Sequence, residues 1–211
     1  MKSRWICLTL GLAMLLTAKG LFAAEEEAKD KEFAATCPVS NKPAVESSVI
    51  ERKDGTKIYF CCENCPKAFK ADPKKFRMQV NRQLLETGQL VQVACPITGK
   101  PENEEISVEM GEAKVGLCCK NCLAKVNDAS DEEKLKLVFG PAGMKKGFTR
   151  QVNCPVSDQP INPEEFTEYE GRKVYFCCEK CKAAFEKEPE KYADKLPKAG
   201  KGKADKEKAA E

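Results

Sequence analysis

Cysteine recurs in this chain of 211 residues in a pattern typical of metal ligands. Twelve of the thirteen cysteines form three sets of four, each with an isolated cysteine, then a vicinal pair, then a fourth cysteine three positions after the pair. The sets are Cys37, Cys61, Cys62 and Cys65; Cys95, Cys118, Cys119 and Cys122; and Cys154, Cys177, Cys178 and Cys181. Thiolate sulfur is a preferred ligand of soft metal ions. We therefore expect three metal sites, one for each set.

The absence of histidine narrows the choice of metal. The chain has no histidine, so sulfur must supply the ligands, completed where needed by water or a carboxylate. Sites rich in thiolate favour zinc, copper(I), cadmium or mercury over hard ions. Met78, Met110 and Met144 are scattered and do not indicate a methionine copper site. Zinc is the first expectation, with copper(I) or another heavy metal as the alternative.

The cysteine pattern also divides the chain into three repeats. The isolated cysteines lie 58 and then 59 residues apart, and each opens a motif of Cys-Pro, an aliphatic residue, a hydroxyl residue and, three residues later, proline. A period of this size marks a unit of structure. The predicted boundaries are 37–92 (repeat 1), 93–150 (repeat 2) and 151–194 (repeat 3). Repeat 2 is divergent, because Gly116-Leu117 stands where the others have Tyr-Phe.

Each repeat is so small that a hydrophobic core alone supplies only a few kcal/mol, so a metal or disulfides must stabilise it. Two short strand-like runs around a turn that contains glycine predict a β-hairpin before each vicinal pair. A helical pattern follows, with Phe69 and Phe76 on one face in repeat 1, and Pro73 predicts a break before a second short helix. The closing cysteines then lie at the start of a helix, whose positive end favours thiolate. The predicted fold is a series of small α+β modules stapled by metal.

These residues resemble a known family. Cys-Pro-Val-Ser, a hairpin that ends in Tyr-Phe-Cys, a further cysteine, then Phe and Pro-x-x-aromatic are similar to the YHS/TRASH-type metal-binding domain. The resemblance covers Cys37–Phe76 and Cys154–Tyr192 and, less completely, Cys95–Val126. It implies three tandem treble-clef or zinc-ribbon-like modules linked to trafficking, resistance or sensing of heavy metals. It also implies ligands at the first, second and fourth cysteine of each set, and leaves Cys62, Cys119 and Cys178 as either fourth ligands or free thiols.

The two ends of the chain have their own signals. Lys2 and Arg4 precede an apolar run from Trp5 to Leu16, which predicts a cleaved signal peptide over 1–24 and a secreted or periplasmic protein. This run is shorter than the roughly 20 residues that cross a bilayer, so no stable membrane insertion is expected. An acidic linker is predicted over 25–36 and a disordered Lys-rich tail over 195–211.

The net charge of the chain bears on its partners. Loss of the signal peptide would leave 33 basic residues against 33 acidic ones. Nucleic acid binding requires a basic face, so no nucleic acid partner is expected. The expected partners are metal ions, with a metal transporter or another exported protein as further candidates.

Three other classes of protein stay open at this point. The modules could use structural zinc and serve protein–protein interaction. They could be a disulfide scaffold, because exported compartments are often oxidising, although vicinal cysteines crowd such a scaffold. The CxxC in each set also permits a thiol–disulfide oxidoreductase, but the repeats are shorter than a thioredoxin-like unit. The absence of histidine disfavours hydrolysis. We expect a protein without enzymatic activity.

Overall fold

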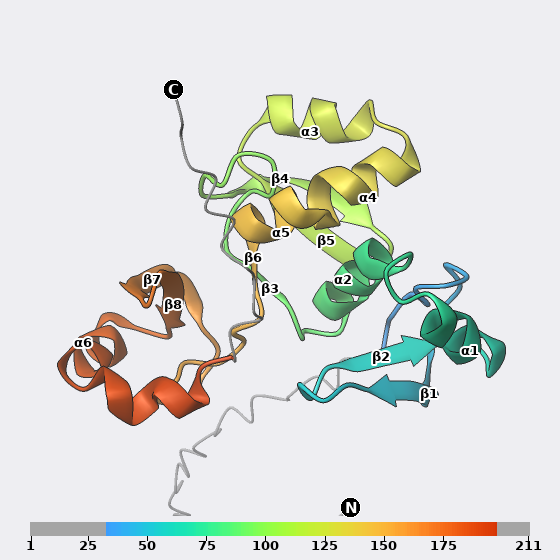
Figure 1. The fold of residues 1–211 in the computed structure, drawn as a ribbon. Helices are drawn as coiled ribbons and strands as arrows, with labels where there is room; N and C mark the ends of the chain where they lie inside the picture. The colour runs from blue at the N-terminus through green and yellow to red at the C-terminus, as the bar shows by residue number, and fades with distance from the viewer. Residues whose placement is uncertain (1–32, 198–211) are drawn as a thin grey trace, which may run out of the picture. The chain divides into compact units, whose positions relative to one another are not determined.

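The computed structural model describes residues 33–197. The predicted signal peptide lies outside this range, as do most of the predicted linker and tail. The described residues form short antiparallel strands and short helices, which confirms the predicted α+β class (Figure 1). Repeat 1 contains β1 (Val45–Glu51), β2 (Lys57–Phe60), α1 (Asn64–Ala71) and α2 (Arg77–Glu86).

Repeats 2 and 3 keep the hairpin and the following helix but differ in what surrounds them. Repeat 2 contains β4 (Asn103–Met110), β5 (Ala113–Leu117), α3 (Lys120–Asn127), α4 (Asp131–Phe139), α5 (Pro141–Gly147) and β6 (Phe148–Thr149). Strand β3 (Val91–Gln92), which pairs with β6, lies just before the predicted start of this repeat and belongs with it in the structure. Repeat 3 contains β7 (Asn162–Tyr169), β8 (Arg172–Phe176), α6 (Glu179–Lys187) and the 3₁₀ helix η1 (Pro189–Lys195). Over residues 33–197, no helix has the length and apolar character that a membrane span requires.

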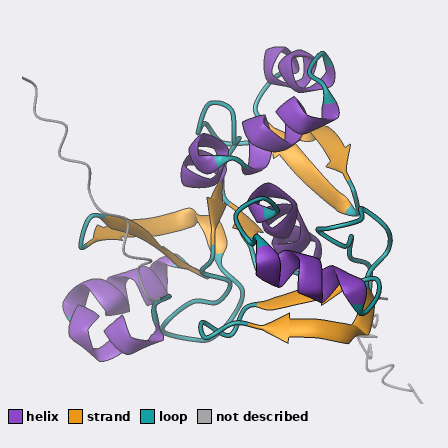
Figure 2. Cartoon of the chain, turned by 45° about the vertical axis from the view of Figure 1, so that its right-hand side comes forward, coloured by secondary structure: helices purple, strands orange, loops and turns teal. Residues whose placement is uncertain are grey.

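A two-stranded antiparallel hairpin lies directly before each vicinal cysteine pair, as predicted (Figure 2). Its turn contains a glycine with positive φ in every repeat, at Gly55, Gly111 and Gly171. Glycine adopts this conformation without the steric cost that a Cβ brings. In each hairpin, the first residue of the first strand pairs with the last residue of the second strand, and the pairing register shifts directly after it. Such a bulge bends the strand at the end of the hairpin where the cysteines lie.

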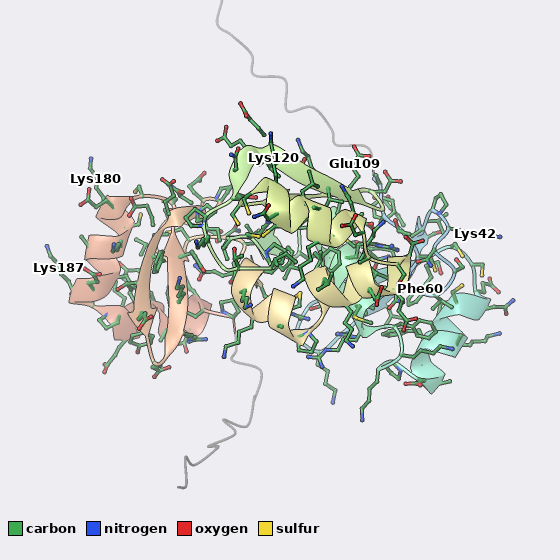
Figure 3. The ribbon with its side chains drawn as sticks, turned by 90° about the horizontal axis from the view of Figure 1, so that it is seen from above. Lys42, Phe60, Glu109, Lys120, Lys180 and Lys187 are labelled. Atoms are coloured by element: carbon green, nitrogen blue, oxygen red, sulfur yellow. The ribbon has the colours of Figure 1, made fainter. Side chains whose placement is uncertain are left out.

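Aromatic side chains fill the core under the hairpin in repeats 1 and 3. Phe60 and Phe176 are fully buried, and their ring centroids lie 5.6 Å and 5.3 Å from those of Phe69 and Phe185 on the following helices. Figure 3 shows Phe60 among the ribbons, whereas the exposed Lys180 extends away from α6. Phe69 and Phe76, predicted to share one helical face, do not lie on one helix: Phe76 directly precedes α2, where its ring packs 6.4 Å from that of Phe69 between centroids.

The buried apolar residues of the described chain form two clusters, not three. One cluster belongs to repeat 3 alone, and the other joins repeats 1 and 2. Helix α2 makes this join, because its Val80 and Leu84 share the cluster with Val138 and Phe139 of α4. In addition, Asn81 Nδ2 donates a hydrogen bond of 3.0 Å to the carbonyl oxygen of Phe139. An architecture of three separate modules is thus not confirmed.

Repeat 2 lacks the aromatic residues of the other two hairpins and buries aromatic residues from later elements instead. Leu117 is fully buried where the other repeats have phenylalanine, and the rings of Phe139 and Phe148 stack at 5.5 Å between centroids. Ser130 and Glu133, which occupy the place of the Pro-x-x-aromatic motif, form a capping box that begins α4. Phe139 of α4 and Phe148 of β6 therefore supply buried aromatic surface that the hairpin of this repeat lacks.

Candidate metal centres

A tight backbone turn holds the isolated cysteine of each set. The residue four positions after this cysteine has a left-handed backbone, with φ of 57° at Asn41, 78° at Gly99 and 62° at Asp158. Its N–H donates to the carbonyl oxygen of the cysteine at 3.0, 2.7 and 2.9 Å respectively. Asn, Gly and Asp are the residue types that adopt this conformation most readily. The turn leaves the cysteine side chain buried in all three repeats.

The other cysteines lie where the hairpin passes into a helix, as predicted. The second strand ends at the residue before the vicinal pair. Cys119 and Cys178 are the residues that immediately precede α3 and α6, and Cys122 and Cys181 lie in the first turn of these helices. Cys65 holds the corresponding place in α1. Two segments about 24 residues apart thus bring their sulfurs to one point in each repeat.

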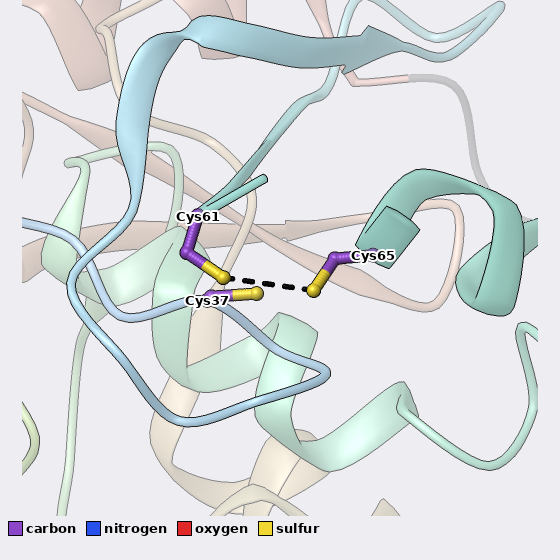
Figure 4. Close-up of side chains that lie close together, drawn as sticks. All are labelled: Cys37, Cys61 and Cys65. Carbon is purple, nitrogen blue, oxygen red and sulfur yellow. Dashed lines mark hydrogen bonds between the residues drawn. The ribbon is translucent and has the colours of Figure 1, made fainter. Parts of the chain in front are cut away.

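Three sulfurs converge in every repeat. The Sγ atoms of the first, second and fourth cysteine of each set all lie within 4.8 Å of one another: Cys37, Cys61 and Cys65; Cys95, Cys118 and Cys122; Cys154, Cys177 and Cys181. Figure 4 shows the first of these groups. We call these groups triads 1, 2 and 3. The Sγ atoms of Cys61 and Cys65 are 3.6 Å apart, and the equivalent separations in triads 2 and 3 are 3.6 and 3.5 Å.

These separations fit a metal ion. With zinc–sulfur bonds of about 2.3 Å, the sulfurs of a tetrahedral site lie about 3.8 Å apart. In each triad, the second and fourth cysteines of the set are within a few tenths of an ångström of that value, and the isolated cysteine lies within 4.8 Å of both. Bound metal would therefore require only small movements of the cysteine side chains.

The third member of each set lies to one side. Cys62, Cys119 and Cys178 do not belong to the groups in which all sulfurs are mutually close. Each is still near its triad: Cys62 Sγ lies 3.5 Å from Cys65 Sγ, Cys178 Sγ lies 3.7 Å from Cys177 Sγ, and Cys119 Sγ lies 3.7 Å from both Cys118 Sγ and Cys122 Sγ. Cys62 and Cys178 are exposed, whereas Cys65 is buried. The structure thus brings together the nine cysteines that the family resemblance implied and leaves the three additional ones at the rim.

A hydroxyl group contacts one sulfur of each triad. Ser40 Oγ lies 3.1 Å from Cys61 Sγ, Thr98 Oγ1 lies 3.2 Å from Cys118 Sγ, and Ser157 Oγ lies 3.1 Å from Cys177 Sγ. A hydroxyl can donate its hydrogen to a thiolate, and such contacts fix the orientation of a metal ligand. This gives a physical role to the hydroxyl residue of the opening motif.

The isolated cysteine of each triad has a lowered pKa. Burial opposes ionisation of Cys37, but hydrogen bonds from the Ser40 hydroxyl and from nearby backbone N–H groups outweigh it and lower its pKa to about 7. Cys95 and Cys154 also have a pKa of about 7, because backbone hydrogen bonds, including those at Cys118 and Cys177, again outweigh burial. A buried thiolate that already exists near neutral pH attracts a cation to the triad.

The cysteine in the first helical turn has the opposite tendency. Burial, followed by hydrogen bonds with the neighbouring thiols, raises the pKa of Cys65 and Cys122, and raises that of Cys181 to about 12. Without a metal, the isolated cysteine of each triad therefore ionises more readily than the cysteine in the first helical turn, which retains its proton. A metal ion would displace that proton, since only thiolate binds metal strongly.

Comparison with known proteins supports this description for one repeat. Residues 153–195, which form repeat 3, match the model of the YHS domain. No curated protein and no solved structure matches the chain. The match to the YHS domain thus covers repeat 3, while the relation of repeats 1 and 2 to it rests on the shared cysteine geometry and the shared turn.

The sequence interpretation missed one group of residues beside the triads. Gln83, Gln92 and Gln151 each place a side-chain amide between the two segments that carry the cysteines. Gln92 and Gln151 both stand three positions before the isolated cysteine, so the repeat itself contained a signal for them. Gln83 comes from α2, far along the chain from Cys37, and no local pattern indicates its role.

Proposed function

We propose that this is an exported protein that binds soft metal ions at three cysteine triads and so sequesters, traffics or senses them. The observation that carries the proposal is the convergence of three sulfurs at the same place in three repeats. The YHS domain match of repeat 3 supports the same class of function. Zinc is the first candidate, and copper(I) or another thiophilic metal is the alternative.

The arrangement of the sulfurs favours metal over disulfides. The twelve cysteines within residues 33–197 are all free thiols. The closest sulfurs in each triad are 3.5 or 3.6 Å apart, whereas a disulfide bond measures about 2.05 Å. One ion satisfies all three sulfurs at once.

The sites favour a metal that is exchanged over one that only stabilises the fold. Structural zinc sites are closed by four protein ligands. Each triad supplies three convergent sulfurs, and the remaining cysteine of the set, Cys62 in repeat 1 and Cys178 in repeat 3, is exposed at the rim. This leaves a coordination position for water, for the rim cysteine or for a ligand from another molecule. A metal transporter or another exported protein is the kind of partner that would use it. We propose no enzymatic activity.

Metal titration of the reduced, processed protein tests the proposal. We expect three zinc or copper(I) ions per chain in competition with a chromophoric chelator. Cys37→Ser, Cys95→Ser and Cys154→Ser should each reduce the stoichiometry by one ion. A fully reduced chain that binds no ion would refute the proposal. Export is tested separately, by sequencing the N-terminus of the protein recovered from the periplasm or the medium.

A further inference from the structure

In repeat 1, one glutamine amide connects the two segments that carry the cysteines. Gln83 Oε1 accepts a hydrogen bond of 2.9 Å from the N–H of Tyr59, and its Nε2 donates to the carbonyl oxygen of Tyr59 at 2.7 Å. The same Nε2 donates to the carbonyl oxygen of Thr36 at 2.9 Å. Tyr59 stands two residues before Cys61, and Thr36 directly precedes Cys37. A single side chain thus ties the isolated cysteine to the closing ones.

The same connection occurs in repeat 2. Gln92 accepts from the N–H of Gly116 at 2.9 Å and donates to the carbonyl oxygens of Gly116 at 2.6 Å and Ala94 at 3.1 Å. Gly116 stands two residues before Cys118, and Ala94 directly precedes Cys95. The partners of the glutamine are thus at the same positions as in repeat 1.

Repeat 3 shows the connection a third time. Gln151 accepts from the N–H of Tyr175 at 3.0 Å and donates to the carbonyl oxygens of Tyr175 and Asn153. Tyr175 again stands two residues before the vicinal pair, and Asn153 directly precedes Cys154. Three equal sets of partners show that the contact belongs to the construction of the site.

The physical role of the amide follows from its hydrogen bonds. An amide side chain has one acceptor and two donor hydrogens, and here they occupy both backbone groups of one strand residue and one carbonyl of the opposite segment. The glutamine therefore takes the place of a neighbouring strand beside the two-stranded hairpin. Gln83 is fully buried and Gln151 is 5% exposed, so loss of the amide would leave buried backbone groups without partners.

We propose that Gln83, Gln92 and Gln151 are positioning residues that set the distance between the isolated cysteine and the closing cysteines of each triad. They act through the backbone and do not touch the metal. This inference rests on the proposed function, namely that the triads bind metal. Because the cysteines of one triad lie on two separate segments, the amide determines how closely three sulfurs match the size of one ion, and so determines affinity and coordination geometry.

Replacement of each glutamine by methionine tests the inference. Methionine keeps the length of the side chain and removes all its hydrogen bonds to the backbone. The full-length protein is used, with a Cys→Ser change in the two triads that are not measured. We expect Gln83→Met, Gln92→Met and Gln151→Met each to lower the zinc affinity of the matching site by about 10 to 100-fold, the range typical of residues that orient metal ligands. The absorption spectrum of bound cobalt(II) should change with it.

Gln89 provides a matched control, because its side-chain amide contacts the same strand, β2. Its amide accepts from the N–H of Lys57 at 2.7 Å and donates to the carbonyl oxygen of Lys57 at 2.8 Å, two residues before Tyr59. It does not reach the segment before Cys37. Gln89→Met should therefore leave the affinity and the cobalt spectrum of triad 1 unchanged, even where it lowers the melting temperature. If Gln83→Met fails to fold, the less buried Gln92 gives the same test in repeat 2.

Three results would overturn the inference. Methionine variants that keep the parent affinity and the parent cobalt spectrum would show that the amide does not position the sulfurs. A loss of affinity in Gln89→Met equal to that in Gln83→Met would show a general effect of stability. A parent protein that binds no zinc or cobalt would refute the proposed function itself, and this inference with it.

Discussion

The division of each set into a triad and a rim cysteine predicts unequal effects of cysteine substitution. We expect Cys61→Ser and Cys65→Ser to abolish tight metal binding in repeat 1, and Cys62→Ser to weaken it only slightly. Serine keeps the size of the side chain and removes the thiolate. The first two residues belong to triad 1, whereas Cys62 Sγ lies outside the group of mutually close sulfurs and is exposed.

The expected loss of affinity follows from the free energy of zinc binding and the number of sulfurs that share it. Structural zinc in small domains contributes about 10 to 16 kcal/mol at neutral pH. Divided over three sulfurs, this is roughly 3 to 5 kcal/mol for each bond, or about 10² to 10⁴-fold in affinity. Cys62 has no part in that division when water completes the site, so its loss should change the affinity less than about tenfold.

The assay is a competition titration of the full-length protein with a chromophoric chelator. Cys118→Ser and Cys177→Ser disable the other two triads, so that only triad 1 reports. A loss of affinity that is equal in all three variants would show that four cysteines are equivalent ligands and would refute the reasoning from sulfur distances. Retention of full affinity in Cys61→Ser would show that triad 1 is not the site.

Three further predictions concern stability and activity. Chelation of the metal should expose repeat 3 to proteolysis before the rest, because its own cluster holds only five buried residues, and limited digestion should leave a fragment near 33–150; earlier cleavage inside that fragment would contradict this. Phe139→Ala should cost about 3 to 5 kcal/mol and destabilise repeats 1 and 2 together in denaturant unfolding, because Phe139 is fully buried in their shared cluster; a loss confined to repeat 2 would contradict the shared core. The reduced protein should be inactive in insulin reduction, and activity that disappears in Cys65→Ser would instead favour the oxidoreductase.

Local pattern was enough to predict the elements that bear the cysteines. A strand-like run after a glycine turn predicted a strand directly before Cys61, and β2 lies there, at Lys57–Phe60. Proline at position 73 predicted the break between α1 and α2. These features depend on neighbours within one or two turns of chain, which the sequence displays directly. The convergence of the three sulfurs follows from the same spacing once the hairpin is formed.

Contacts between repeats could not be predicted in this way. The apolar residues of α2 show that one face is buried but not which residues cover it, and α4 of the next repeat does so. The sequence shows Leu117 where the other repeats have phenylalanine. It does not show that Phe139, which lies outside the repeated motif, is buried in the core of repeat 2 instead. Gln83 escaped notice for the same reason, since it replaces a glutamine that the other repeats carry beside the cysteine.

Each triad has one positioning glutamine, and the part of the chain that supplies it determines which repeats can be transferred to another protein. Repeat 3 contains its own Gln151 and its own buried cluster, so we expect residues 151–197 to be transferable as a single metal-binding unit. Repeat 1 receives its amide from α2, which is anchored on repeat 2 through Asn81, and Glu86 of the same helix accepts from the backbone N–H of both Thr36 and Glu112. Repeats 1 and 2 would therefore have to be inherited, or grafted, as a pair.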